Sequence, residues 1–197
     1  MKASIRNLGF WVVATVMIGA LPASAQDAPK LEGSILYAAT HVPDRWYDVG
    51  VNIDGSFAIG ARLAVLGEVG WGRARAKDFD FERTRAAYNV TTVGGGLRYN
   101  MVGEKWTPYG QVVLGISHDT FDPRTCFLFA ECVGVAYSTT SFMIQPGGGA
   151  VYKVAENWGI VGHVDYRRVL DGQLTADGDE GFNAFRLGIG IRFMSAN

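Results

Sequence analysis

After residue 25 the chain has no apolar run long enough to cross a membrane as a helix, which takes about 20 residues. Helical periodicity is almost absent from the same part of the chain. A membrane protein built from helices is therefore excluded. An excess of basic residues is also missing, because 18 Lys and Arg face 19 Asp and Glu. This balance argues against a nucleic-acid partner, which would favour a basic surface.

Cysteine is scarce, with Cys126 and Cys132 as the two in the chain. They lie close together in a predicted loop, and the spacing favours a disulfide in an oxidising compartment, with two free thiols as the alternative. A zinc site would need more ligands nearby, and His118 is the one close candidate. We therefore expect neither a metal ion nor a cofactor.

The first 25 residues have the pattern of a signal peptide. Lys2 and Arg6 precede an apolar run over 8–21, and Ala23-Ser24-Ala25 supplies the small residues of a signal-peptidase site. We expect export, cleavage after Ala25 and one mature domain over 26–197. The alternative is an uncleaved anchor, but the run is shorter than a spanning helix requires.

Glycine and aromatic residues are abundant in the mature chain, where apolar residues alternate with small or polar ones. Such alternation is the period of a strand whose two faces meet different environments. At the C-terminus Phe185, Leu187, Ile189, Ile191 and Phe193 alternate with arginine and glycine. The pattern predicts eight strands, near 33–40, 47–59, 62–73, 87–100, 106–118, 138–153, 158–169 and 182–194.

The connections between these strands alternate in length. Tight turns are predicted at 60–61, 102–105 and 154–157, and long polar loops at 74–86, 119–137 and 170–181. Short turns on one side and long loops on the other are typical of outer-membrane barrels, whereas a soluble sandwich has no reason to sort its connections. The sequence therefore predicts an all-β fold, an eight-stranded antiparallel up-and-down transmembrane β-barrel.

Charged residues share the small-residue face of the predicted strands. In a membrane barrel this face lines the lumen, whereas in a soluble barrel it would face water over an apolar core. Because buried charges are costly unless paired, we expect a network of ion pairs that fills the lumen. Its predicted members are Glu68, Arg98, His163, Asp165, Arg167, Arg186 and Arg192.

Aromatic residues near the strand ends favour the membrane barrel over the soluble one, because such residues form girdles at both membrane interfaces. The periplasmic girdle is predicted to contain Trp106, Tyr109, Trp158, Tyr152, Tyr99 and Phe193. The outer girdle is predicted to contain Trp46, Tyr47, Trp71 and Tyr166.

Four segments resemble the bacterial outer-membrane protein β-barrel domain family, whose small members include OmpA-like and OmpX-like barrels. They are 107–115, 145–150, 163–167 and 185–193. The last also resembles the strand signal that the assembly machinery recognises, carried here by Phe185, Leu187, Ile189, Ile191 and Phe193. As a departure from that signal, Met194-Ser195-Ala196-Asn197 follows the final aromatic residue. The resemblance implies a monomer in the bacterial outer membrane, in contact with lipid, lipopolysaccharide and the assembly machinery.

Catalysis is not expected. An enzyme needs a nucleophile beside a base, but Ser117 and His118 are consecutive strand residues and should face opposite ways. The glycine runs 94–96 and 147–149 fall inside predicted strands, so neither is a phosphate-binding loop. We expect a structural, adhesion or surface-interaction role, with a lipid-modifying barrel enzyme or a narrow solute channel as alternatives.

Overall fold

The computed structural model describes residues 30–42, 45–47, 49–76, 83–126, 137–170 and 181–195. The predicted signal peptide and its cleavage site lie outside these residues. The described part of the chain contains no helix that is both long and apolar enough to cross a membrane.

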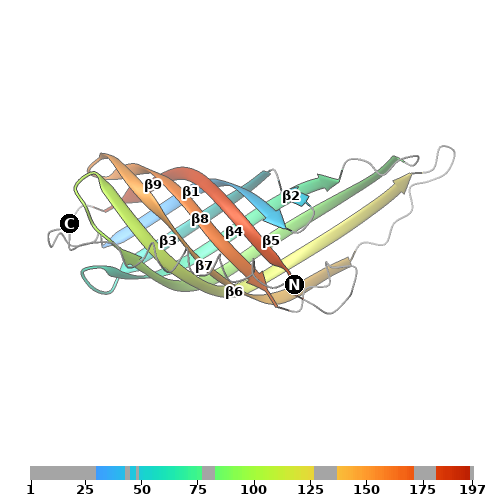
Figure 1. Cartoon of the computed structure of the whole chain (residues 1–197), viewed down its shortest axis with the longest axis horizontal. Coiled ribbons are helices and arrows are strands. Elements are labelled where there is room, and N and C mark those ends of the chain that lie inside the picture. Colours follow the sequence, from blue (N-terminus) through green and yellow to red (C-terminus); the bar gives the residue numbers. More distant parts are fainter. Residues whose placement is uncertain are drawn as a thin grey trace, which may run out of the picture.

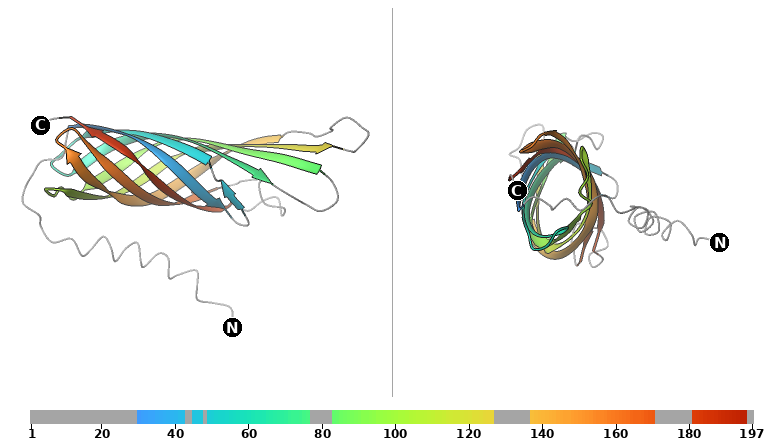
Figure 2. Two further views of the ribbon diagram at one scale, coloured as in Figure 1. Left: turned by 90° about the horizontal axis from the view of Figure 1, so that it is seen from above. Right: turned by 90° about the vertical axis from the view of Figure 1, so that its left-hand side faces the viewer.

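Nine strands make up the described structure. They are β1 (Leu31–Val42), β2 (Arg45–Tyr47), β3 (Val49–Ala58), β4 (Leu63–Ala76), β5 (Arg83–Asn100), β6 (Trp106–Cys126), β7 (Tyr137–Ala155), β8 (Trp158–Val169) and β9 (Asn183–Met194). From β3 to β9 each strand pairs antiparallel with the next, and β1 pairs with both β3 and β9. The sheet therefore closes into an eight-stranded barrel, as predicted, seen as a ring along its axis in Figure 2. The short β2 pairs with the end of β1 and lies outside the count of eight.

The two ends of the barrel differ. The tight connections after β3, β5 and β7 and the end of β9 lie at one end, drawn at the left of Figure 1. At the other end β5 and β6 reach furthest from the barrel (Figure 1). We call these the short-turn end and the long-loop end.

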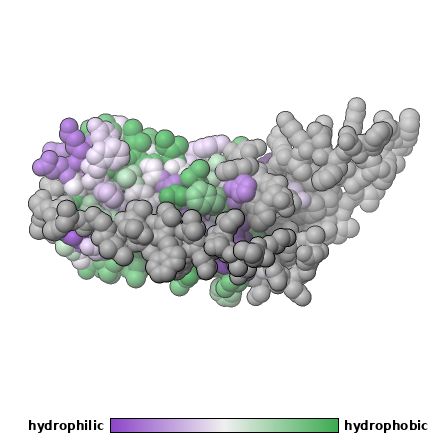
Figure 3. Space-filling view, in the orientation of Figure 1, coloured by the Kyte–Doolittle hydropathy of each residue, from purple (hydrophilic) through white to green (hydrophobic). Residues whose placement is uncertain are grey.

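The barrel is polar inside and apolar outside. Along β3 the outward Val51 and Ile53 are exposed, whereas the inward Asn52 and Asp54 are buried. Figure 3 shows hydrophobic residues, in green, along the upper and lower edges of the coloured part of the barrel, and hydrophilic residues, in purple, gathered at its short-turn end. A soluble barrel has the opposite arrangement, since its interior is its only hydrophobic core. The inversion indicates a wall that faces lipid.

Two predicted loops are shorter than the sequence suggests, which corrects the prediction. The loop predicted at 74–86 begins only after β4 ends at Ala76, and β5 starts at Arg83. The loop predicted at 119–137 is strand as far as Cys126, in register with β5 throughout. Alternation marks a strand only where its two faces meet different environments. Beyond the membrane both faces meet water, so the backbone pairing continues after the sequence signal has ended.

Glycine has a packing role at some positions and none at others. A Cβ at Gly96 would lie 1.9 Å from the carbonyl oxygen of Val112, whereas a Cβ at Gly67 would meet nothing within 4 Å. We expect Gly96→Ala to lower the free energy of unfolding by about 1 to 3 kcal/mol through overpacking. Gly67→Ala should change it by less than about 0.5 kcal/mol. Urea unfolding of both variants in lipid vesicles measures this difference, and equal midpoints would contradict the assigned packing.

Candidate functional site

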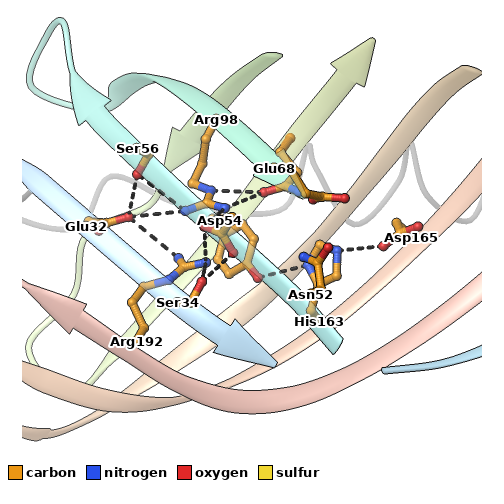
Figure 4. Close-up of polar contacts among 12 residues, drawn as sticks. Glu32, Ser34, Asn52, Asp54, Ser56, Glu68, Arg98, His163, Asp165 and Arg192 are labelled. Atoms are coloured by element: carbon orange, nitrogen blue, oxygen red, sulfur yellow. Dashed lines mark hydrogen bonds and ion pairs between the residues drawn. The ribbon is translucent and has the colours of Figure 1, made fainter. Parts of the chain in front are cut away.

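The lumen holds the chemistry-bearing side chains of the barrel, in two linked networks (Figure 4). Strand alternation places these side chains inward, and barrel closure brings distant strands face to face. The turn-end network consists of Glu32, Ser34, Asp54, Ser56, Arg98, Gln111 and Arg192. The central network consists of Asn52, Glu68, Gln145, His163, Asp165, Arg167 and Arg186.

Two arginines and two acids form the centre of the turn-end network. Arg98 Nη2 donates to Asp54 Oδ1 at 2.8 Å, and Arg98 Nη1 lies 3.4 Å from Glu32 Oε2. Arg192 lies 3.6 Å from Glu32 Oε2 and 3.7 Å from Asp54 Oδ1. Each acid therefore contacts both cations, and the four charges cancel.

Neutral polar side chains complete this network. Gln111 Oε1 accepts from Arg98 Nε at 2.9 Å and from Nη2 at 2.7 Å. Ser34 donates to Asp54, and Ser56 donates to Glu32 Oε2 at 3.2 Å. Such contacts offset part of the desolvation cost of buried charges.

Arg186 is the centre of the second network. It donates from Nε to Asp165 Oδ2 at 2.7 Å, from Nη2 to Glu68 Oε1 at 2.7 Å and from Nη1 to Asn52 Oδ1 at 2.9 Å. One guanidinium thus joins β9 to β8, β4 and β3 across the lumen. Three strands other than its own are held by one side chain.

Arg167 joins the central network through an amide. Its Nε donates to Gln145 Oε1 at 2.8 Å, and Gln145 Nε2 donates to Glu68 Oε1 at 2.8 Å. Within the described residues no acid lies at ion-pair distance from Arg167. The structure thus brings Glu68, Asp165 and Arg186 into direct contact and connects Arg167 to them indirectly.

Tyr109 links the two networks, and its prediction as a girdle residue is wrong. The side chain is 4% exposed and points into the lumen. Trp106 lies on the outward face three residues away, so strand alternation requires Tyr109 to face inward. The ring lies beneath the guanidinium carbons of Arg98, at 4.8 Å, and Arg192, at 4.4 Å. The Tyr109 ring therefore makes cation–π contacts with both arginines and also connects the two networks.

The hydrogen bonds of His163 assign its tautomer. Nε2 lies 2.8 Å from Asp165 Oδ2, and Nδ1 lies 2.9 Å from the hydroxyl of Tyr109. Because the carboxylate is an acceptor, Nε2 carries a proton, and in this tautomer Nδ1 accepts a hydrogen bond from the Tyr109 hydroxyl.

We expect Tyr109→Phe to lower the free energy of unfolding by about 1 to 3 kcal/mol, because Nδ1 of His163 loses its partner in a buried site. The ring beneath Arg98 and Arg192 is retained in this variant. Urea unfolding followed by tryptophan fluorescence measures the loss. Tyr99→Phe is the control, since Tyr99 is 44% exposed on the outer wall; a similar loss there would contradict the assignment.

An apolar layer covers the networks at the long-loop end. Val90, Met143, Val169, Phe182 and Ala184 are buried against one another inside the barrel. Below them, a cavity of about 20 Å³ is lined in part by Thr92, Arg167 and Arg186. This volume suits about one water molecule. The lumen between the two ends is filled largely by side chains.

Several lumen residues were absent from the sequence prediction. Glu32 lies one residue before the predicted first strand, and Asp54 lies on the inward face of the predicted strand 47–59. Gln111 and Gln145 are uncharged, so a pattern of charged residues does not include them. Strict alternation from Ile53 and Val112 would have found Asp54 and Gln111.

The outward residues behave as the strand pattern predicts. Phe185, Leu187, Ile189, Ile191 and Phe193 all lie exposed on the outer face of β9. Trp71, Tyr99, Trp106, Tyr152, Tyr166 and Phe193 are exposed at the outer wall, and Trp158 is partly exposed. The side chains of Trp46, Tyr47 and Cys126, and all of Cys132, lie outside the described part, so the disulfide stays a prediction.

The candidate groups for catalysis are separated. Ser117 is buried and donates to Asp119 Oδ2 at 3.1 Å, whereas His118 is exposed on the outer wall. His118 Nδ1 lies 2.8 Å from Thr140 Oγ1. Within the described ranges, no group of three or more His, Cys, Asp or Glu side chains could hold a metal ion.

Comparison with known proteins agrees with this architecture. Structures that are similar include Neisserial surface protein A (14% identity, 84% of this chain and 96% of that chain covered, TM-score 0.56). A major outer membrane protein from Thermus thermophilus gives 12% identity, 83% and 98% coverage and a TM-score of 0.59. The attachment invasion locus protein Ail of Yersinia pestis gives 16% identity, 85% and 100% coverage and a TM-score of 0.51. At these identities the similarity shows the fold alone.

A search of curated proteins finds no match to the chain. The family model described as the outer membrane protein beta-barrel domain matches residues 9–193. This match covers most of the chain and agrees with the closed barrel, its polar lumen and its apolar outer wall. The chain therefore belongs to the outer membrane protein beta-barrel domain family.

Proposed function

We propose that this protein is a non-catalytic outer-membrane barrel whose long-loop end carries an extended sheet for surface interactions. The observation that carries the proposal is the extension of β4 to β7 beyond the rest of the barrel. β5 and β6 pair in register as far as Arg83 and Cys126, whereas β8 ends at Val169. Short turns lie in the periplasm and long connections outside in such barrels, which supports a position of this sheet on the cell surface.

The length of β6 supports an external role. It has 21 residues, whereas a tilted membrane strand needs about 9 to 11. The outward apolar residues of β6 run from Trp106 to Ile116 and satisfy that requirement. About ten residues of β6 therefore extend beyond the lipid. A barrel whose role was confined to the membrane would not need these additional strand residues.

The filled lumen favours an anchor over a channel. Arg98 and Arg192, two of the largest buried side chains, cross the lumen near the short-turn end. Eight strands leave room for side chains alone, and here the side chains are mutually hydrogen-bonded. Conduction would require both networks to separate.

A lipid-modifying enzyme is the second candidate, favoured by the His118–Thr140 contact on the outer wall. A catalytic histidine is normally oriented by a third group. Asp119, the acid next to His118 in the sequence, is buried in the lumen and accepts from Ser117, whereas the His118 ring lies on the outer wall. The His118–Thr140 contact is more simply explained as a hydrogen bond between two exposed polar side chains.

The proposal is tested by trimming the β5–β6 extension in cells that display the protein. The variant joins Ala74 to Tyr88 and Phe121 to Tyr137, each through a two-residue turn, which removes the extension and keeps the barrel register. We expect normal outer-membrane levels but loss of cell binding to at least one surface among immobilised laminin, collagen and fibronectin. Equal binding by trimmed and full-length forms to all three would reject the proposed role. Hydrolysis of labelled lipid by the full-length protein, abolished by His118→Ala, would support the enzyme instead.

A further inference from the structure

Asp119 differs from the acids of the two networks, each of which contacts an arginine. Its side chain is buried in the lumen, and in the part of the chain that the structure describes no Lys, Arg or His lies at ion-pair distance from it. The Ser117 hydroxyl donates to Oδ2 at 3.1 Å, and Oδ1 has no partner among the described protein groups. Asp119 is thus a buried acid with one hydrogen bond and no counter-ion.

The charges of the described lumen do not cancel when every acid is ionised. The buried charged side chains are the cations Arg98, Arg167, Arg186 and Arg192 and the acids Glu32, Asp54, Glu68, Asp119 and Asp165. The His163 tautomer with its proton on Nε2 adds no charge. One negative charge is therefore in excess, and a buried charge without a partner is costly. Because Asp119 lies outside both networks, a proton on its carboxyl group removes the excess.

Asp119 lies beyond the membrane, at the long-loop end. On the outward face of β6, Ile116 is the last exposed apolar residue, and the next outward residue is the polar His118. A change of this kind marks the edge of the hydrocarbon layer in a membrane barrel. Thr139, which pairs with Asp119 on β7, is partly exposed. The carboxyl group is therefore buried but close to the solvent at this end.

The neighbouring strands surround Asp119 with apolar and neutral groups. On β5 it pairs with Val90, which belongs to the apolar layer, and Tyr88 packs against the same layer. On β7 it pairs with the hydroxyl-bearing Thr139. None of these side chains carries a positive charge. The surroundings therefore suit a neutral carboxyl group better than a carboxylate.

Two groups that can carry a positive charge lie further away. Arg167 on β8 donates from Nε to Gln145, and the His118 ring lies on the outer wall. Burial raises the pKa of the Asp119 carboxyl from 3.8 to about 6, although the Ser117 hydroxyl and both distant groups act in the opposite direction. The carboxyl group therefore changes its charge over about pH 5 to 7.

We propose that Asp119 is a proton-binding site that closes and opens the long-loop end of the lumen. The neutral carboxyl group packs beside the apolar layer and keeps this end closed. The carboxylate takes up water, which separates Asp119 from Val90 and loosens the pairing of β6 with β5 and β7 at this level. The networks below do not include Asp119, so they stay closed in both states. The site adds regulation by protons and does not depend on what the extended sheet binds.

The raised pKa fixes the direction of the effect. The closed state keeps its proton up to about pH 6, whereas a hydrated carboxyl group in the open state releases it near pH 4. Closure is therefore most stable in acid, and opening is favoured as the pH rises through this window. From about pH 5 to about pH 7 the ratio of open to closed molecules should rise about 10-fold.

Hydrogen exchange of the mature barrel in lipid nanodiscs measures this opening, when it is followed by NMR and corrected for the intrinsic rate at each pH. We expect the protection of the amides around Val90, Asp119 and Thr139 to fall about 10-fold from about pH 5 to about pH 7. The amide of Asn100, which donates to the Arg62 carbonyl at the short-turn end, should not change.

Asp119→Asn should keep the higher protection at both pH values, because a neutral amide accepts from Ser117 without a charge. His118→Gln is the control, since histidine also changes its charge in this range, and it should leave the 10-fold change intact. The same change in Asp119→Asn, or its loss in His118→Gln, would overturn the proposal. Equal changes at the two ends of the barrel would also overturn it.

Direct titration tests the site in the unmodified protein, whatever the folding of Asp119→Asn. In ¹³C NMR of aspartate-labelled barrel we expect one carboxyl resonance with a midpoint near pH 6. Ser117→Ala should move this midpoint upward, because the carboxylate loses its donor. Midpoints that all lie at about pH 4 or below, or a midpoint that Ser117→Ala leaves unchanged, would contradict the site.

The trimmed variant separates this proposal from the proposed function, since it keeps Asp119 and its partners on β5 and β7. Proton-linked opening in the trimmed variant together with unchanged cell binding would reject the surface role and support the proton site. Loss of cell binding on trimming, with no effect of pH on exchange in the intact protein, would do the reverse.

Discussion

Arg186→Met is expected to lower the free energy of unfolding by about 3 to 5 kcal/mol, which is the cost of breaking a buried ion pair by removing one partner. Glu68 and Asp165 each accept from Arg186 at 2.7 Å, and both are buried. Removing the guanidinium leaves these two carboxylates in the lumen with too little positive charge. Urea unfolding in lipid vesicles, followed by tryptophan fluorescence, measures the loss.

The partner substitution is the control for Arg186. Arg186→Met combined with Glu68→Gln removes one charge of each sign and should recover part of the lost stability. Asp165→Asn should also destabilise the barrel, since it weakens the acceptor of both Arg186 and His163. If the double variant were as unstable as the sum of the single ones, the ion pair would not hold the lumen together.

Leu187→Arg is expected to lower the free energy of unfolding by about 2 to 4 kcal/mol, as an arginine near the bilayer midplane does in such barrels. Leu187 is exposed on the outer wall, where it pairs with Ala39 on β1 and Val164 on β8. The substituted guanidinium would meet hydrocarbon. The same unfolding measurement gives the loss.

Thr91→Arg is the control, because Thr91 lies outward near the long-loop end of β5 and the cost of an arginine near the membrane interface falls to about 0 to 1 kcal/mol. Gly188→Arg should fail for a different reason, since a Cβ at Gly188 already lies 3.2 Å from Leu36 Cδ2 inside the barrel. Unchanged stability of Leu187→Arg would show that the faces of β9 are assigned wrongly.

The strand pattern predicted the fold because every membrane strand separates lipid from lumen. Phe185 to Phe193 shows this directly, since alternate residues are exposed and inward arginines are buried. The same rule would have placed Tyr109 in the lumen. Its side-chain type suggested a girdle, but Trp106 three residues earlier already occupies the outward face. Its position along the strand, an odd number of residues from Trp106, therefore predicts its face better than its side-chain type does.

The contacts inside the lumen could not be predicted in the same way. Alternation gives the face of each residue, but the partner depends on closure and strand stagger. Arg186 and Asn52 are 134 positions apart, and Arg98 and Glu32 are 66 apart. The contact between Arg186 and Asp165 is different, because these residues lie on consecutive strands that pair in any up-and-down barrel. Contacts between strands that are not neighbours in the sheet can be predicted only when the register of every strand pair is known.

The central claim is that a closed barrel spans the membrane with a lumen filled by hydrogen-bonded side chains, and conductance of the mature protein in planar bilayers tests it most directly. The account predicts current at background level for the unmodified protein, and also for Asp165→Asn under conditions in which that variant stays folded. A steady open channel in the unmodified protein, abolished or made anion-selective by Asp165→Asn, would contradict it and show that these residues line a pore.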